Sequence, residues 1–172
     1  MLSYKASILA FVKSKYRLTD CFSEDIFFYL YHAKDVENRA YVVCVYKAAY
    51  ISVDLSRELI GMAEKLVMLS HPNLLNVIDY DYDGQYFYVV YEGFGGAVPL
   101  IDFLKNNSFD VTNLWQLSTQ ILQGCLFLEQ RSFKHGFLNL NSIYVSSNGQ
   151  VKMMHVSLLL ILLGAHLDDL DV

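Results

Sequence analysis

Two aromatic and β-branched runs, residues 26–31 and 40–46, constrain the fold of this 172-residue chain most strongly. Bulky side chains of these kinds favour extended backbone, because they suit a pleated, half-buried surface. The polar segment Asp35-Val36-Glu37-Asn38-Arg39 lies between the two runs and has the composition of a turn. The pattern therefore predicts an antiparallel β-hairpin in the first third of the chain.

A helix and a second hairpin are predicted next. Apolar residues recur at helical spacing over residues 59–69, with Asp54 or Ser56 as the candidate N-cap. Pro72 ends this helix, since proline disfavours helical backbone in the residue before it. Residues 74–80 and 85–91 are the strands of the second hairpin, with a turn at Asp83-Gly84. The expected result is a small twisted sheet of five strands, one of them before residue 26, with one helix inserted after the third.

The second half of the chain is predicted to be mainly helical. A short helix is expected over residues 100–104 and a longer one over residues 111–130, which are rich in leucine and isoleucine. Residues 142–156 have the pattern of one more hairpin, with its turn at residues 146–149. The fold class is therefore α+β.

Composition limits the functions that such a chain can have. Apolar residues make up 54% and charged residues 18%, which excludes a disordered chain and suggests an apolar surface that a protein partner covers. The net charge of −5 provides no basic field for nucleic acid. Cys21, Cys44 and Cys125 have no metal-ligand spacing and are interpreted as reduced thiols. No cofactor and no metal are expected.

Two segments bear on the compartment. The first 19 residues carry four basic side chains, several serines and no acid, so they overlap in composition with mitochondrial transit peptides. A basic N-terminal helix or extension over residues 1–15 is the preferred interpretation, with a cytoplasmic location and an organelle interior as the alternative. The longest apolar run, residues 158–163, is far shorter than the roughly 20 residues that cross a bilayer. No membrane span is expected.

Several phrases occur in the order in which a protein kinase begins. Residues 69–75 (LSHPNLL) are similar to the kinase phrase between the first helix and the fourth strand, and residues 87–92 (FYVVYE) to the fifth strand before the hinge. Residues 135–143 (HGFLNLNSI) occupy the slot of the catalytic loop, and His155-Val156-Ser157 the slot of Asp-Phe-Gly. Residues 16–158 thus resemble the protein kinase superfamily. The resemblance implies a five-stranded small lobe over residues 16–94 and a partial helical large lobe over residues 95–172.

The resemblance also implies that the catalytic positions have lost their chemistry. Phosphoryl transfer needs a carboxylate beside the attacking hydroxyl and two metal-binding side chains. The position of the base is Phe137, and the metal-binding positions are Ser142 and His155. The glycine-rich loop would lie near residues 21–28, where no glycine occurs.

The nucleotide-binding positions are degenerate as well. The ATP-binding lysine aligns with Val45, or with Lys47 if the register moves by two residues. Its partner on the helix falls at Met62, with Glu64 or Glu58 as displaced substitutes. Any remaining nucleotide contacts would come from Lys47 and from the hinge-like Glu92 and Phe94.

The function implied is that of a catalytically inactive pseudokinase acting as a scaffold or accessory subunit through protein–protein contacts. A nucleotide-binding regulatory module without phosphotransfer is the alternative. Residues 42–46 and the His135 loop resemble those of the Scy-like trafficking pseudokinases. Leu158, Leu160 and Leu162 are the predicted partner-binding residues, with a helix folded back on its own lobe as the alternative for residues 158–163.

Overall fold

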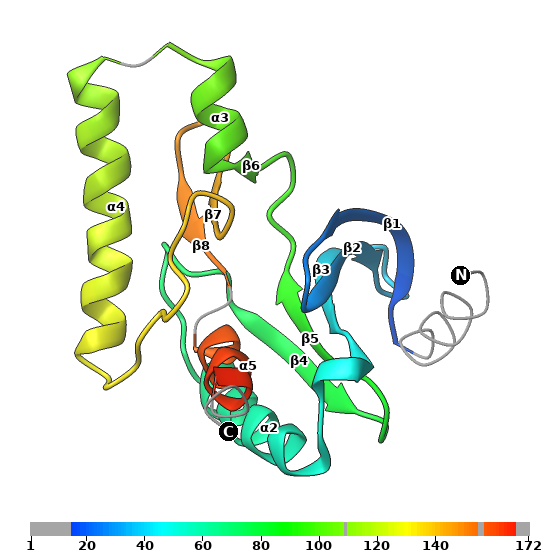
Figure 1. The fold of residues 1–172 in the computed structure, drawn as a ribbon. Coiled ribbons are helices and arrows are strands. Elements are labelled where there is room, and N and C mark those ends of the chain that lie inside the picture. Colours follow the sequence, from blue (N-terminus) through cyan, green and yellow to red (C-terminus); the bar gives the residue numbers. More distant parts are fainter. Residues whose placement is uncertain (1–14, 109, 155–156, 168–172) are drawn as a thin grey trace. The chain divides into compact units, whose positions relative to one another are not determined.

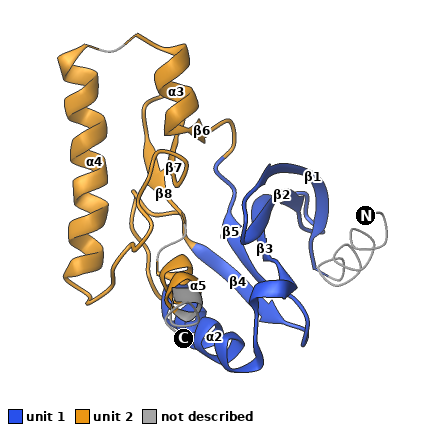
Figure 2. Ribbon diagram, viewed as in Figure 1, with its two compact units in different colours: residues 1–67, 77–94 blue, residues 68–76, 95–172 orange. Residues whose placement is uncertain are grey.

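The computed structural model describes residues 15–108, 110–154 and 157–167, and the chain divides into two compact units (Figures 1 and 2). The first unit contains the described residues up to Val67 together with Val77–Phe94. The second contains Met68–Asn76 and the described residues from Gly95 onward. The predicted helix or extension over residues 1–15 lies almost entirely outside the described residues. No helix in the described part of the chain combines the length and apolarity needed to cross a membrane.

The first unit is built on the predicted five-stranded antiparallel sheet (Figure 1). Its strands lie side by side in the order β1-β2-β3-β5-β4. Their bounds are Arg17–Glu24 (β1), Phe28–Lys34 (β2), Ala40–Tyr46 (β3), Val77–Tyr82 (β4) and Phe87–Glu92 (β5). The fourth strand begins at Val77 and not at residue 74 as predicted, because the backbone before it pairs within the second unit.

Aspartate side chains form the two turns that the sequence predicted in the first unit. Asp35 Oδ1 accepts hydrogen bonds from the backbone N–H groups of Glu37 and Arg39, both at 2.9 Å. Asp83 Oδ1 does the same for the N–H groups of Gln85 and Tyr86, at 2.8 and 2.7 Å. Each carboxylate therefore accepts hydrogen bonds from backbone N–H groups that have no strand partner where the chain reverses.

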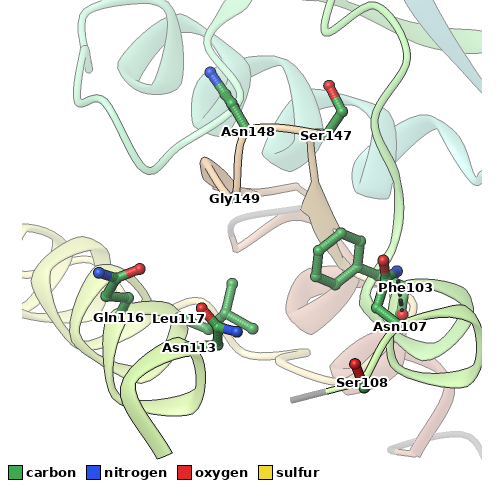
Figure 3. Close-up of a pocket in the computed structure, with 9 residues that line it drawn as sticks. All are labelled: Phe103, Asn107, Ser108, Asn113, Gln116, Leu117, Ser147, Asn148 and Gly149. Carbon is green, nitrogen blue, oxygen red and sulfur yellow. Dashed lines mark hydrogen bonds between the residues drawn. The ribbon is translucent and has the colours of Figure 1, made fainter. Parts of the chain in front are cut away.

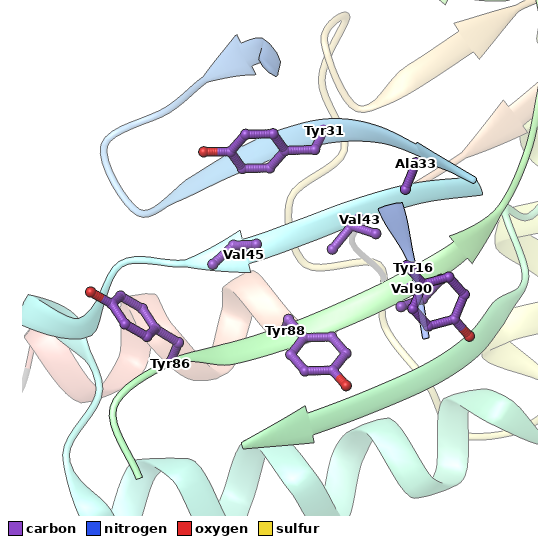
Figure 4. Close-up of a cluster of buried hydrophobic side chains, with 8 residues drawn as sticks. All are labelled: Tyr16, Tyr31, Ala33, Val43, Val45, Tyr86, Tyr88 and Val90. Atoms are coloured by element: carbon purple, nitrogen blue, oxygen red, sulfur yellow. The ribbon is translucent and has the colours of Figure 1, made fainter. Parts of the chain in front are cut away.

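Both faces of the sheet carry buried side chains. On one face lies a buried cluster of eight side chains: Tyr16, Tyr31, Ala33, Val43, Val45, Tyr86, Tyr88 and Val90 (Figure 4). The alternating residues Leu30, Cys44, Tyr46, Phe87, Val89 and Tyr91 point to the other face and are at most 2% exposed. No residue of the helix α2 (Val53–Val67) belongs to the cluster or packs on it. Because α2 packs against β4 with a buried apolar stripe, it covers the face that carries Cys44.

The start of α2 differs from the prediction. Ser52, and neither Asp54 nor Ser56, caps the helix, since its Oγ accepts a hydrogen bond from the Leu55 N–H at 3.1 Å. Asp54 lies in the first turn and pairs with Arg57, whereas Ser56 is buried and donates to the Val53 carbonyl at 2.7 Å. A short 3-10 turn, η2 (Ala48–Tyr50), connects β3 to this region.

The second unit contains a small sheet and three helices (Figure 2). The helices are α3 (Leu100–Asn106), α4 (Val111–Glu129) and α5 (Leu158–Leu167). The sheet has the order β6-β7-β8, with strands Val98–Pro99, Ile143–Val145 and Val151–Met153. The predicted hairpin over residues 142–156 is thus present with strands of only three residues. α4 begins after Asp110, whose side chain accepts a hydrogen bond from the Asn113 N–H at 2.7 Å.

Asn73 links residues 68–76, which follow α2, to the rest of the second unit through hydrogen bonds. Its side chain is buried and donates from Nδ2 to the Val151 carbonyl at 3.0 Å and to Gln120 Oε1 at 3.2 Å. Its own carbonyl accepts from the Met153 N–H at 2.9 Å. These bonds place residues 68–76 in the second unit, although the sequence had assigned them to the small lobe.

The C-terminal apolar run forms α5. Leu158, Leu159 and Leu162 are at most 1% exposed, whereas Leu160 is 43% exposed. Leu160 contacts Gly136 of the same unit, because a Cβ atom at Gly136 would lie 2.7 Å from the Leu160 Cβ. The run therefore folds back as a helix in which the Leu158 and Leu162 side chains are already buried within the chain, while Leu160 is partly exposed. A partner contact through these three residues stays a prediction.

Candidate functional site

The loop in the catalytic slot, residues 135–142, is organised by one asparagine. Asn139 Oδ1 accepts hydrogen bonds from the N–H groups of Asn141 at 2.8 Å and Ser142 at 3.1 Å. Its Nδ2 donates to the Phe137 carbonyl at 3.2 Å. Sequence reasoning did not select Asn139, although asparagine commonly holds a turn through such bonds. The loop therefore has a defined shape that leads directly into β7.

Ser142, the first degenerate metal position, has its hydroxyl fully engaged within the loop. Oγ accepts a hydrogen bond from the Asn139 N–H at 3.0 Å and lies 3.0 Å from the carbonyls of both Phe137 and Asn139, to which it can donate. The residue is 2% exposed. The side chain that occupies this position is thus directed inward, as a bridge between backbone groups.

Phe137, at the position of the base, lies next to a constrained backbone. Its side chain is half-buried and has no atom that accepts a proton. The preceding Gly136 has φ +77°, and Leu160 of α5 leaves no room there for a Cβ atom. Glycine is therefore required at residue 136 both for the left-handed backbone and for the contact with α5.

The segment in the Asp-Phe-Gly slot is described only from Ser157. His155, the other degenerate metal position, lies outside the described residues. Ser157 has φ +60°, an uncommon conformation for a residue with a Cβ atom. Its N–H donates to the His135 carbonyl at 3.0 Å, and its Oγ donates to the Lys134 carbonyl at 2.6 Å. These two bonds hold the unusual backbone and attach the start of α5 to the loop.

His135 opens the loop as a buried, neutral imidazole. It is 7% exposed, and neither ring nitrogen has a hydrogen-bond partner among the described residues. Burial lowers the pKa of His135 to about 4, and the nearby backbone of His135 and Met154 opposes this only in part. The ring is therefore a structural filler at neutral pH, without the charge that would attract a phosphate group.

In the first unit, the β1–β2 turn replaces the expected glycine-rich loop. It consists of residues 25–27, and Asp25 Oδ1 accepts a hydrogen bond from the Phe27 N–H at 3.2 Å. The Asp25 N–H donates to the Phe28 carbonyl at 2.9 Å, and the Phe27 carbonyl accepts from the Lys47 N–H at 2.8 Å. This turn contains no glycine and is tied to the end of β3, so its backbone N–H groups are not arranged as a phosphate cradle.

Lys47 is bound to this hairpin. Its Nζ lies 3.0 Å from Glu24 Oε1 and 4.5 Å from the centroid of the Tyr29 ring. Partial desolvation opposes protonation, but the hydrogen bond to Glu24 and the Tyr29 ring raise the pKa of Lys47. The lysine is thus a persistent cation, and its described partners lie at the ends of β1 and β2.

The helix residues predicted to pair with a catalytic lysine are not partners of Lys47. Glu58 and Glu64 are exposed on α2, and Met62 is half-buried. Val45, the other candidate for the lysine position, belongs to the cluster on the face opposite α2. An ion pair with the helix requires a side chain on the α2 side of β3. Neither Val45 nor Lys47 meets this requirement.

On the α2 side, β3 presents Cys44, which the sequence reasoning missed. It is fully buried, and burial raises the pKa of its thiol well above the usual range. The two-residue side-chain period of the strand was the signal that could have separated Cys44 from Val45. The local sequence does not show which face of the strand the helix covers, so only the structure could show that Cys44 lies on the α2 side.

The hinge-like residues lie far from Lys47. Glu92 pairs with Tyr41, the second residue of β3, whereas Lys47 follows the last residue of that strand. Six residues of extended chain separate these positions, roughly 20 Å. Glu92 and Phe94 are both half-buried, and the intervening Gly93 lies so close to the Ala40 carbonyl that a Cβ atom would collide with it. The structure therefore does not bring Lys47, Glu92 and Phe94 together.

A separate cavity of about 290 Å³ lies in the second unit, between α3, α4 and the β7–β8 turn (Figure 3). Its lining is mainly neutral and polar: Phe103, Asn107, Ser108, Asn113, Gln116, Leu117, Ser147, Asn148 and Gly149. With no acid and no base in this lining, it offers neither a metal site nor a partner for phosphate charge. Among all described residues, no group of three histidines, cysteines or carboxylates is placed to hold a metal ion.

Comparison with known proteins agrees with the fold. The family described as protein tyrosine and serine/threonine kinase matches residues 23–163, so the chain belongs to this family. The crystal structure of Rad53 1-466 in complex with AMP-PNP matches with a TM-score of 0.75 and 19% sequence identity. That match covers 86% of this chain and 39% of the Rad53 chain, and at this identity it shows the fold alone.

Proposed function

We propose that this chain is a catalytically inactive member of the kinase family that acts as a scaffold or accessory subunit. The observation that carries the proposal is the state of the loop at residues 135–142. Its base position is a phenylalanine, and the hydroxyl at its metal position is used by backbone groups of the same loop. Loss of a general base alone costs about 10²- to 10⁴-fold in rate.

The positions that would bind ATP also argue against catalysis. The residue on the α2 side of β3 is a buried cysteine, and Lys47 is bound to Glu24. We therefore expect no nucleotide to bind at Lys47, Glu92 and Phe94. We also propose that the chain is a pseudokinase related to the Scy-like group, which residues 42–46 resemble. Its proposed location is the cytoplasm.

A protein-binding role is supported by one face of α4, which we call the α4 stripe. It consists of exposed apolar side chains: Val111, Leu114, Trp115, Leu122 and Leu126. Val111 is 83% exposed and Trp115 is 74% exposed. α4 carries no ionisable side chain before Glu129 except the thiol of Cys125. Contiguous apolar surface of this kind is typical of protein–protein contacts.

Two measurements test the proposal. Incubation with ATP and Mg²⁺ should give no autophosphorylation and no phosphate transfer to a general substrate protein above the background of a Lys47→Ala variant. Titration with ATP, with and without Mg²⁺, should leave the thermal unfolding temperature unchanged. Phosphate transfer that Lys47→Ala abolishes would show that the chain is an enzyme, and an ATP-dependent rise in unfolding temperature would favour a nucleotide-binding regulator.

The scaffold role has its own test. Proteins that copurify with the chain should be lost from a Leu122→Glu variant and retained by Gln116→Glu, which introduces the same charge on α4 outside the stripe. Equal retention by both variants would show that the α4 stripe is not the interaction surface.

A further inference from the structure

The α4 stripe has the same spacing when it is followed from either end of the helix. Val111, Trp115, Leu122 and Leu126 are separated by four, seven and four residues. Side chains three, four or seven residues apart lie on one face of an α-helix, so these four share a face as two apolar pairs. When two such helices are placed antiparallel, Val111 faces the other copy's Leu126 and Trp115 faces the other copy's Leu122. The small residues Ser118 and Thr119 then lie at the centre of the contact.

We infer that the chain self-associates through the α4 stripe as a symmetric antiparallel helix pair. This inference rests on the proposed function, because it names a second copy of the chain as one partner of the same surface. In a two-fold interface the same patch serves both copies, which requires a self-complementary arrangement. The four–seven–four spacing meets this requirement for Val111, Trp115, Leu122 and Leu126, whereas Leu114 lies opposite Gln123 of the other copy.

Charge favours a second copy and an antiparallel direction. From Val111 to Leu128 the helix has no acidic and no basic side chain, so two copies meet without like-charge repulsion despite the net charge of −5 of the whole chain. Antiparallel pairing also places the positive end of each helix dipole beside the negative end of the other. A parallel pair would place like ends together and Trp115 against Trp115.

The area is that of a weak dimer. The five side chains expose roughly 500 Å² of apolar surface per copy, at about 100 Å² for an aliphatic side chain and more for tryptophan. The pair would bury roughly 1,000 Å², at the lower limit for specific interfaces. Interfaces of this size are typical of weak, transient contacts, so we expect dimerisation to be concentration-dependent.

A charge-exchange experiment tests both the contact and its direction. Sedimentation equilibrium of the whole chain between about 1 and 200 µM should show a monomer–dimer equilibrium. Trp115→Lys and Leu122→Glu, each alone, should weaken dimerisation by about tenfold or more, since each places a charge opposite an apolar side chain. An equimolar mixture of these two variants should dimerise again. In the mixed pair, the lysine introduced into one copy faces the glutamate introduced into the other, while the second pair of facing side chains stays native.

Matched controls separate the contact from folding. Gln116→Lys and Gln116→Glu should dimerise like the unmodified chain, and all variants should retain its far-ultraviolet circular dichroism. A chain that stays monomeric at the highest concentration, a dimer insensitive to Trp115→Lys, or a mixture that does not recover would each overturn the inference. A monomeric chain that still captures partner proteins through the α4 stripe would overturn the inference and leave the proposed function intact. A dimer with phosphotransferase activity would overturn the proposed function and leave the inference standing.

Discussion

Replacement of His135 by leucine should remove most of a pH dependence of stability that the buried imidazole creates. Burial lowers the pKa of His135 to about 4 in the folded chain, whereas an unfolded histidine has a pKa near 6.5. The unfolded state therefore binds a proton more readily than the folded state between these values. The stabilisation is fully present above about pH 6.5 and is lost as the pH falls toward 4.

The size of the effect follows from the two pKa values. One pKa unit corresponds to about 1.4 kcal/mol, so His135 should cost the fold about 2 kcal/mol between pH 7 and pH 5 and about 3 kcal/mol by pH 4. At pH 7 the leucine variant should be as stable as the parent or more stable by about 1 kcal/mol, because it removes a buried imidazole that has no hydrogen-bond partner among the described residues. An asparagine variant should lose the same pH dependence but be less stable than the leucine variant at pH 7.

The pH dependence of the unfolding free energy can be measured by urea unfolding, followed by circular dichroism at pH 5, 6, 7 and 8. The quantity of interest is the difference in unfolding free energy between parent and variant, in which all other titrating groups cancel. That difference should change by about 2 kcal/mol from pH 7 to pH 5. A difference that is constant with pH would refute the protonation argument. A loss of more than about 2 kcal/mol on leucine substitution at pH 7 would show that the imidazole makes an essential hydrogen bond.

Three further predictions concern backbone and hydrogen-bond constraints. Asn73→Ala should lower the unfolding free energy by about 2–3 kcal/mol, because it removes one buried and one partly buried hydrogen bond. Asn107→Ala removes an exposed hydrogen bond and should lower the unfolding free energy by less than about 0.5 kcal/mol. Equal losses for the two variants in urea unfolding would contradict this. Gly93→Ala should lower the thermal unfolding temperature through collision with a β3 carbonyl, and Gly95→Ala, which meets nothing within 4 Å, should change it little; a harmless Gly93→Ala would show that the strand ends move apart freely. Ser142→Ala should lower the unfolding free energy by about 1–3 kcal/mol in the absence of Mg²⁺, because it removes the hydrogen bonds of the Ser142 hydroxyl within the loop. A loss of stability seen only with Mg²⁺ would indicate that Ser142 is a metal ligand instead.

Local sequence was sufficient for most elements. Four strands of the five-stranded sheet followed from aromatic and β-branched runs, whereas β1 has no such run and only the kinase resemblance implied it. The two turns predicted in the first unit rest on Asp35 and Asp83, whose side chains bond to backbone groups two to four residues away. The chemical identity of the loop positions also came from sequence, since Phe137 lacks an acceptor in any conformation. These properties depend on residue type and on neighbours along the chain.

Other features depended on residues that are distant in the sequence. Asn73 binds Gln120 and Val151, which lie 47 and 78 positions away, so no local pattern assigned residues 68–76 to the second unit. The burial of Leu158 and Leu162 likewise depends on packing that an apolar run alone does not specify, because such a run suits a partner surface and a core helix equally well.

The lysine position shows the division between sequence and tertiary structure in one strand. The alternation of residues along β3 was readable from the sequence, and it placed Val45 and Lys47 on one face and Cys44 on the other. Which face α2 covers is a property of the packed unit, because a strand with apolar residues on both faces can receive a helix on either side. The residue types and their periodicity were therefore determined by the sequence alone. The face that would hold a lysine–glutamate pair, and the partners that Lys47 has instead, were decided only by tertiary packing.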